Sequence, residues 1–343
     1  MSKYIVSSSP HIANRRTVSG IMTEVLIALI PAVVASVYFF GFYALFLEIL
    51  SVGAAIGAEA LFNLILKKEQ TIKDCSAAVT GLLLALNLPV SVPFYVPIIG
   101  SIFAIVFVKM LFGGIGKNFA NPAIAGRIFL LLAWAAAMTS FVKPIVWSNG
   151  EAFLYFRCAF KGTAGLKEVA AFTTATPLAS LRTGGIHTEN LLSMFLGGIG
   201  GSLGETSALA LLIGGVYLIV RRIIDWRVPV TFIGTVVVFA LIYGATKGSA
   251  LGYILPSVLG GGLMLGAFFM ATDYSTSPNT KVGLTVFAFG CGILTSLIRF
   301  FGNYPEGVSF AILLMNIATP YIDKAFKPHP FGYIKKKAGG DKR

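Results

Sequence analysis

The sequence predicts an all-α polytopic membrane protein with about ten transmembrane helices, arranged as two inverted five-helix halves with broken helices at the core. Of its 343 residues, 56% are hydrophobic and only 12% are charged, whereas soluble domains carry about 25% charged residues. The polar surface that a soluble protein needs is therefore missing. The apolar runs are continuous rather than alternating, which excludes a membrane β-barrel. The 38 glycines suit a bundle in which small residues let helices approach closely.

Charge and cysteine content exclude several other classes. The net charge is +13, which in a membrane protein is typical of basic cytoplasmic loops facing anionic lipid. No basic stretch interleaved with aromatic residues indicates nucleic-acid binding. Cys75, Cys158 and Cys291 are far apart and form no CxxC pair, so we expect neither a metal site nor an iron–sulfur cluster held by this chain alone.

The first group of apolar segments contains one that is too short to cross a membrane unaided. A span needs about 20 apolar residues, and we expect spans at 21–40, 43–66, 77–88, 94–112 and 123–141. The third segment is the short one, and the prolines that follow it (Pro89, Pro93 and Pro97) each lack a backbone donor. Broken helices are tolerated at membrane depth only where they are buried in protein or face a cavity. This segment is therefore a first pointer to a site.

The second group follows a polar stretch, and the basic residues predict its orientation. We expect spans at 206–220, 228–244, 251–271, 282–301 and 308–322. With the N-terminus in the cytoplasm, 18 of the 27 Lys and Arg residues face inside, 7 face outside and 2 lie within spans. The positive-inside rule thus predicts that both termini are cytoplasmic. Five spans in each group would invert the second group relative to the first, and inverted repeats commonly hold a site between them.

This topology divides the chain into five regions. They are a cytoplasmic segment (1–20), the first half (21–141), an outer loop region (142–205), the second half (206–322) and a basic cytoplasmic tail (323–343).

The segment Gly113–Ala123 lies between two predicted spans and combines three glycines with Asn118 and Asn121. One interpretation is a loop followed by a capped helix that starts at Asn-Pro-Ala. A second is a polar pocket for a small planar ligand such as a flavin. A water-type pore is weakly indicated, because such pores pair two Asn-Pro-Ala segments and this chain has one.

The segment Phe172–Leu178 in the outer region is rich in threonine. Threonine hydroxyls in loops ordinarily serve as turn or capping groups. A hydroxyl can also receive a nucleotide from an external enzyme, and the predicted topology exposes this loop on the outer face.

Several carboxylates lie in or near the predicted spans, and an acid within a membrane is a functional candidate. For Glu24 and Asp74, a place at the membrane interface is the simpler interpretation. Their oxygens would suit Na⁺ or a proton relay, and the sequence leaves both open. The set comprises Glu24, Glu48, Glu59, Asp74, Glu205, Asp273 and Asp323.

Taken together, the motifs resemble the D subunit of Rnf complexes, which are ion-translocating ferredoxin:NAD⁺ oxidoreductases, and more distantly the B subunit of Na⁺-translocating NADH:quinone reductases. The resemblance covers nearly the whole chain in order. Its matching stretches are SSSPHI, VLIALIPA, SAAVTGLLLALNLP, KMLFGGIGKNFANPA, TTATPL, GGSLGETSALALLIGGVYL, FMATDYSTSP and IATPYID.

The resemblance implies two flavins. An FMN would be joined through its phosphate to Thr176 by a flavin transferase, although Thr174 stands where the family pattern usually has glycine. A noncovalent riboflavin would lie near Asn118 and Asn121. The acids that the family uses in cation uptake would correspond to Asp74, Asp273, Asp323 and Glu24.

The expected function is therefore a flavin-carrying subunit of a redox-driven Na⁺ or H⁺ translocase in a bacterial or archaeal plasma membrane. Its partners would be membrane lipid and the other subunits of the complex, and not nucleic acid. The chain lacks a GxGxxG fingerprint for NAD, so we expect no complete active site of its own. The alternative is a stand-alone channel or transporter for a small solute or ion.

Overall fold

The computed structural model describes residues 17–142, 144, 178, 191–248, 250–302 and 307–327. Within these residues every regular element is a helix, which confirms the predicted all-α class. The first part contains α1 (Val18–Phe40), α2 (Phe42–Ile65), η1 (Ile72–Asp74), α3 (Ser76–Leu86), α4 (Tyr95–Phe103), the π-helical η2 (Ala104–Met110), α5 (Pro122–Ala133) and α6 (Ala135–Met138). The second part contains α10 (Leu191–Leu196), α11 (Ala208–Val220), α12 (Arg227–Thr246), α13 (Ala250–Leu259), α14 (Leu263–Leu265), the π-helical η5 (Gly266–Met270), α15 (Lys281–Phe301) and α16 (Val308–Ala325).

Each segment predicted as a span contains a helix, but the helices differ in length. Four of them, α1, α2, α12 and α15, are long and apolar enough to cross a membrane. A fifth span results if α13 and the following α14 and η5, which are bent by 56° at their junction, count as one. The described part of the chain thus contains four or five helices that are long and apolar enough to cross a membrane, and the count of ten spans and the two inverted halves stay predictions.

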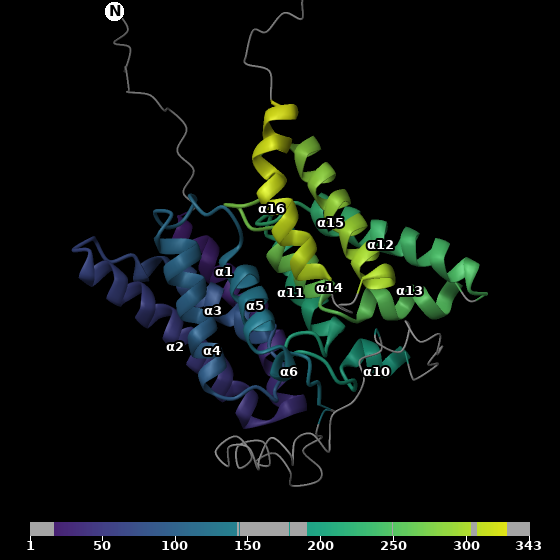
Figure 1. Cartoon of the computed structure of the whole chain (residues 1–343), viewed down its shortest axis with the longest axis horizontal. Coiled ribbons are helices and arrows are strands. Elements are labelled where there is room, and N and C mark those ends of the chain that lie inside the picture. The colour runs from purple at the N-terminus through teal and green to yellow at the C-terminus, as the bar shows by residue number, and fades with distance from the viewer. Residues whose placement is uncertain are drawn as a thin grey trace, which may run out of the picture.

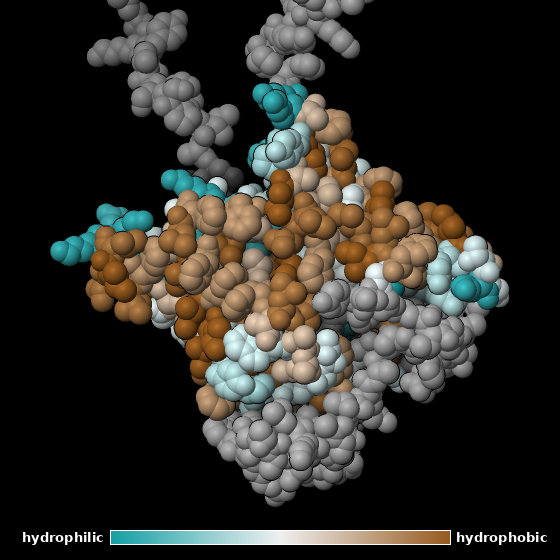
Figure 2. Space-filling model, viewed as in Figure 1, coloured by the Kyte–Doolittle hydropathy of each residue, from teal (hydrophilic) through white to brown (hydrophobic). Residues whose placement is uncertain are grey.

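The outer surface of these helices is strongly apolar. Figure 2 shows a broad brown band across the face in view, with teal residues gathered along its upper rim. Large exposed apolar side chains come from helices in both parts of the chain, among them Val34, Ile49, Leu64, Val238 and Leu314. A surface of this extent is unfavourable in water and suits contact with lipid.

The described ends of the chain lie together. In Figure 1 the start of α1 and the end of α16 are at one end of the bundle, whereas α6 and α10 are at the other. Since α6 precedes the predicted outer loop region and α10 lies within it, this arrangement places the two chain ends away from that region.

Helices pack alike in the two parts of the chain. The long helix α2 packs on α3 and α4, and the long helix α12 packs on α13 and α15. Between the parts, α1 and α11, which begin the two groups of predicted spans, pair with each other, and so do α5 and α16. Gly214 permits the first of these pairings, because a Cβ at Gly214 would overlap the Ala28 carbonyl of α1.

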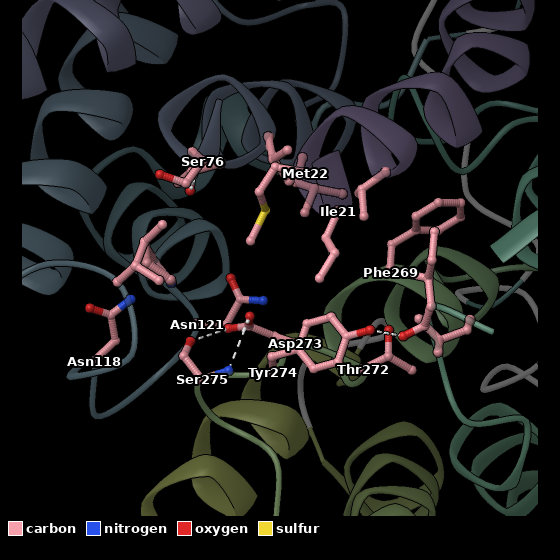
Figure 3. Close-up of a pocket in the computed structure, with 18 of the residues that line it drawn as sticks. Ile21, Met22, Ser76, Asn118, Asn121, Phe269, Thr272, Asp273, Tyr274 and Ser275 are labelled. Atoms are coloured by element: carbon pink, nitrogen blue, oxygen red, sulfur yellow. Dashed lines mark hydrogen bonds between the residues drawn. The ribbon is translucent and has the colours of Figure 1, made fainter. Parts of the chain in front are cut away.

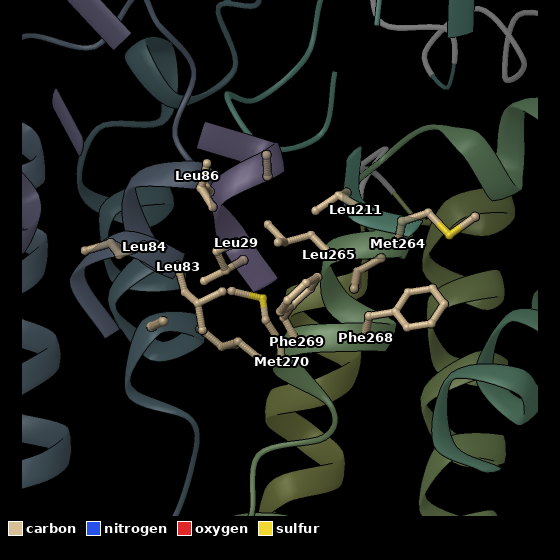
Figure 4. Close-up of a cluster of buried hydrophobic side chains, with 14 of the residues drawn as sticks. Leu29, Leu83, Leu84, Leu86, Leu211, Met264, Leu265, Phe268, Phe269 and Met270 are labelled. Carbon is tan, nitrogen blue, oxygen red and sulfur yellow. The ribbon is translucent and has the colours of Figure 1, made fainter. Parts of the chain in front are cut away.

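One apolar core joins the two parts. In Figure 4, Leu29 of α1 and Leu83 of α3 face Phe269 and Met270 of η5. Leu29 is fully buried. Apolar contact of this kind holds the two groups of helices together and leaves the polar groups between them to form a site.

Two helices end inside the protein, and each break is closed by polar groups from elsewhere. The last turn of a helix leaves carbonyls without partners. At the end of α3, Leu88 O and Leu86 O accept hydrogen bonds from the backbone nitrogens of Leu203 (2.9 Å) and Gly204 (2.7 Å). The predicted break after the third apolar segment is thus confirmed, and it is buried against the chain that precedes α11.

The second break, between α13 and α14, is closed by an arginine. Arg299 of α15 donates to Ser257 O at 2.5 Å and to Gly261 O at 2.9 Å. Gly261 has φ +72°, a left-handed conformation that glycine adopts without strain. The buried guanidinium therefore satisfies the carbonyls that the break leaves open.

Candidate functional site

A pocket of about 190 Å³ lies between the two groups of helices. The volume is roughly an order of magnitude larger than one water molecule needs. Apolar lining residues come from α1, α3, α11 and η5 and include Met22, Leu83 and Phe269. The polar lining of the pocket comes from the first two turns of α3, from η2, from the loop before α5 and from the loop after η5. Its polar lining residues are Ser76, Thr80, Lys109, Asn118, Asn121, Thr272, Asp273 and Ser275.

Asn121 links the two groups of helices at the pocket wall. Its Oδ1 accepts from Ala123 N at 3.0 Å, which caps α5, and Pro122 occupies the first turn. Its Nδ2 donates to Met270 O at 3.2 Å. The sequence-based interpretation of this segment as a capped helix is thus confirmed, and the same residue also lines the pocket (Figure 3).

Asn118 lines the pocket, and its side chain has an acceptor without a partner. Its Oδ1 is buried and has no hydrogen-bond partner among the described residues. Buried polar atoms are nearly always satisfied in folded proteins. An acceptor of this kind fits a ligand that brings its own donor, such as the N–H edge of a flavin ring.

Asp273 lies on the loop after η5, outside the helices. Its Oδ2 accepts from Ser275 Oγ at 2.9 Å and from Thr276 Oγ1 at 3.1 Å. Burial raises the pKa of Asp273 against the opposite effect of these hydrogen bonds. The carboxyl is therefore closer to titration near neutral pH than an ordinary aspartate.

Asp74 does not line the pocket, but it is one hydrogen bond away from it. Its Oδ1 accepts from Ser76 N at 2.9 Å and from Ser76 Oγ at 2.7 Å. Ser76 Oγ also accepts from Lys109 Nζ at 2.5 Å. Lys109 in turn forms a buried ion pair with Glu59 at 2.7 Å. A chain of hydrogen bonds thus connects Asp74 to the pocket wall and to α2.

Two of the acids predicted from the sequence lie elsewhere. Glu24 forms an ion pair with Arg221 and accepts from the Tyr217 hydroxyl. Asp323 accepts from Asn279 N at 3.0 Å and Asn279 Nδ2 at 3.1 Å. The structure therefore brings Asn118, Asn121 and Asp273 together in one pocket, with Asp74 adjoining, and it does not add Glu24 or Asp323 to its lining.

Thr176 lies outside the described residues, but Leu178 is described and is 5% exposed. A Cβ at Gly260 would lie 2.8 Å from Leu178 Cδ1, and a Cβ at Gly261 would lie 2.7 Å from Leu178 Cδ2. Leu178 therefore packs directly on the break between α13 and α14, beside Arg299.

Sequence reasoning listed Glu205 among the carboxylates near the spans, but it did not find the contacts that Glu205 and Arg127 make at the two helix breaks. Arg127 Nη1 donates to Asn87 Oδ1 at 2.8 Å, at the end of α3, and to Ser309 Oγ at 3.0 Å. Glu205 accepts from Gly261 N at the other break. The sequence feature that could have pointed to these residues is an ionisable side chain within or beside an apolar segment. The sequence alone did not indicate which of these side chains contact one another.

These features define a helical membrane protein with a polar pocket between two groups of helices. A protein-family model described as the NQR2, RnfD, RnfE family matches residues 5–332, so the chain belongs to this family.

Individual relatives confirm the predicted resemblance to the Rnf D subunit. The chain is 44% identical over 335 residues to the D subunit of the Na⁺-translocating ferredoxin:NAD⁺ oxidoreductase complex of Acetobacterium woodii, covering 97% of this chain and 96% of the relative. It is 43% identical to the D subunit of the proton-translocating ferredoxin:NAD⁺ oxidoreductase complex of Clostridium ljungdahlii, with 96% of each chain covered. A third relative, the D subunit of the ion-translocating oxidoreductase complex of Stutzerimonas stutzeri, is 38% identical, with 93% of each covered.

Proposed function

We propose that this chain is the flavin-carrying membrane subunit of an ion-translocating ferredoxin:NAD⁺ oxidoreductase complex. It would relay electrons through a covalent FMN on Thr176 and a second, noncovalent flavin in the pocket. The family membership and the names of the relatives support the complex. The single observation that carries the flavin site is the amphipathic pocket with its unsatisfied Asn118 acceptor.

The covalent FMN is supported by the position of Leu178. Thr176 precedes Leu178 by two residues in the sequence. Leu178 is buried at the break between α13 and α14. A flavin on Thr176 would therefore be attached close to the packed core, where protein groups can tune its potential. A flavin transferase would be needed for the attachment.

The second flavin is supported by the chemistry of the pocket. A flavin ring has two apolar faces and one polar edge, and the pocket lining combines apolar side chains with polar ones. Asn118 and Asn121 would hold the polar edge, and Phe269 and Leu83 would pack on the ring. The flavin itself supplies the electron chemistry, while these residues orient it and exclude water.

The membrane arrangement we propose has ten spans in two inverted halves. Its support is that α2 packs on α3 and α4 much as α12 packs on α13 and α15, and that α1 pairs with α11 and α5 with α16. Both chain ends would face the cytoplasm, and Thr176 would lie on the outer face. The shared end of α1 and α16, opposite α6 and α10, agrees with this arrangement.

The cation path that we propose runs past Asp273 and Asp74 at the pocket, with Asp323 and Glu24 at the same end of the bundle. Two relatives of nearly equal identity are named for different ions, Na⁺ and the proton. The ion is therefore best decided by measuring Na⁺ dependence of transport in vesicles that contain the whole complex.

Mass spectrometry tests the covalent site. We expect the peptide containing Thr176 to carry an FMN-sized adduct, and Thr176→Ala to abolish in-gel flavin fluorescence after denaturation. Thr174→Ala is the matched control and should keep the adduct. An unmodified Thr176 peptide from cells that have the transferase would contradict the proposal. A colourless protein that conducts a solute in vesicles would favour a stand-alone channel instead.

A further inference from the structure

The buried ion pair on the pocket wall has an orientation. Lys109 lies on π-helical η2 and is among the pocket-lining residues, whereas Glu59 lies on α2 and is not. The Nζ–Oε2 distance is 2.7 Å, and the two residues are 2% and 0% exposed. The positive end of the pair therefore faces the pocket and the negative end lies behind it.

Of the two residues in the pair, Lys109 on the pocket side is the one with a hydrogen-bonding group to spare. Glu59 is satisfied at both oxygens, because Oε1 accepts from the Thr71 hydroxyl and Oε2 from Lys109. The Lys109 ammonium has three hydrogens, and its acceptors among the described residues are Glu59 Oε2 and Ser76 Oγ. One hydrogen remains for a group in the pocket.

Stability does not account for this pair. Burying two charges costs several kcal/mol for each, and apolar replacements of similar volume are often neutral or stabilising. π-Helical turns such as η2 occur frequently at functional sites. The other charged group in the pocket lining is Asp273, whose carboxyl already accepts from two hydroxyls. Lys109 is thus the cation of this pocket within the described part of the chain.

We propose that the Lys109–Glu59 pair sets the charge preference of the pocket: Lys109 stabilises the negative charge of a reduced flavin, and Glu59 moderates that effect. The inference rests on the proposed second flavin. Reduction by two electrons with uptake of one proton leaves one negative charge on a neutral isoalloxazine ring. A cation at the pocket wall therefore favours the reduced form over the oxidised form.

The test is the affinity of riboflavin for the purified complex from which noncovalent flavin has been removed. Calorimetry gives Kd for oxidised riboflavin and, under anaerobic conditions, for dithionite-reduced riboflavin. Glu59→Gln removes the moderating charge, so we expect the ratio of reduced to oxidised affinity to rise at least tenfold. Lys109→Met combined with Glu59→Gln removes both charges without leaving either unpaired, and we expect the ratio to fall at least tenfold. A tenfold change corresponds to about 30 mV for two electrons.

Glu48→Gln is the matched control. Glu48 lies on the same helix as Glu59 and is also buried, at 2% exposed, but it accepts a hydrogen bond from Ser36, which does not line the pocket, whereas Glu59 pairs with the pocket-lining Lys109. We expect the ratio of reduced to oxidised riboflavin affinity of Glu48→Gln to equal that of the wild type.

Opposite shifts in the two charge variants would support the inference, because a merely structural role would not change sign. Equal ratios in all proteins, or shifts in one direction, would overturn the charge role and leave the second flavin standing. If Glu59→Gln does not assemble, an unchanged ratio in the double variant is decisive against the inference. A wild-type complex that binds riboflavin in neither state would overturn the second flavin and this inference together.

Discussion

Individual buried charges in this molecule are stabilised by contacts that are distant in sequence. Lys109 pairs with Glu59 fifty residues away, and Arg299 binds the carbonyls of Ser257 and Gly261. Each such group would be costly to bury without those partners. At the residue scale, most buried polar groups of the described site have partners, whereas the Asn118 oxygen has none among the described residues.

Alanine variants of Asn118 and Asn121 separate ligand binding from stability. Asn118→Ala removes no hydrogen bond from Oδ1 in the described protein, so we expect unchanged thermal stability but at least tenfold weaker riboflavin binding. Asn121→Ala loses a helix cap and the bond to Met270, so stability should fall by about 1–2 kcal/mol. Thermal unfolding and riboflavin calorimetry on the purified complex separate the two effects. Equal stability losses would contradict the distinction.

The raised pKa of Asp273 predicts that the stability of the folded protein depends on pH. Because burial raises its pKa in the folded protein, the folded state binds this proton more tightly than the unfolded state. Its contribution is therefore favourable at acidic pH and is lost as the pH rises from the ordinary aspartate range through the raised pKa. Asp273→Asn cannot titrate, so its unfolding midpoint should fall less over that range. Parallel wild-type and variant curves would show that other groups dominate.

At the scale of elements, two helices stop inside the protein. α3 ends at Leu86 and α13 ends at Leu259. Their open carbonyls are met by backbone or arginine donors. Broken helices of this kind place irregular backbone at a protected position, as membrane sites require.

A substitution at the contact between α1 and α11 tests how closely these two helices pack. Gly214→Ala should destabilise the protein by several kcal/mol, because its Cβ would overlap the Ala28 carbonyl and the two helices would have to separate. Gly53→Ala is the control, since a Cβ at Gly53 meets nothing within 4 Å, and alanine favours a helix. Thermal unfolding in detergent measures both. A well-folded Gly214→Ala protein would contradict the close helix contact.

At the scale of the whole molecule, the polar pocket lies where two groups of helices meet. Asn121 of the first group bonds Met270 of the second across 149 residues, and the apolar core passes through the same junction. Movement of one group against the other would therefore change the pocket directly.

The proposed topology is tested by cysteine labelling of the whole chain in closed vesicles. Gln70, in the exposed turn after α2, and Lys247, after α12, are both exposed. In a background without native cysteines, Gln70→Cys should be labelled only from the cytoplasmic side and Lys247→Cys only from the outer side. Labelling of both from one side would refute the inverted arrangement.

The sequence alone determined the helical membrane class, the approximate helix positions and the break that follows Leu86, because hydropathy and proline are local signals. It also placed Asn118, Asn121 and Asp273 among the candidates. Only the tertiary structure decided that these three share a pocket, that Lys109 pairs with Glu59, and that Glu24 and Asp323 lie elsewhere. The physical reason is that hydropathy specifies which residues avoid water, whereas the pairing of buried polar groups depends on how distant helices pack.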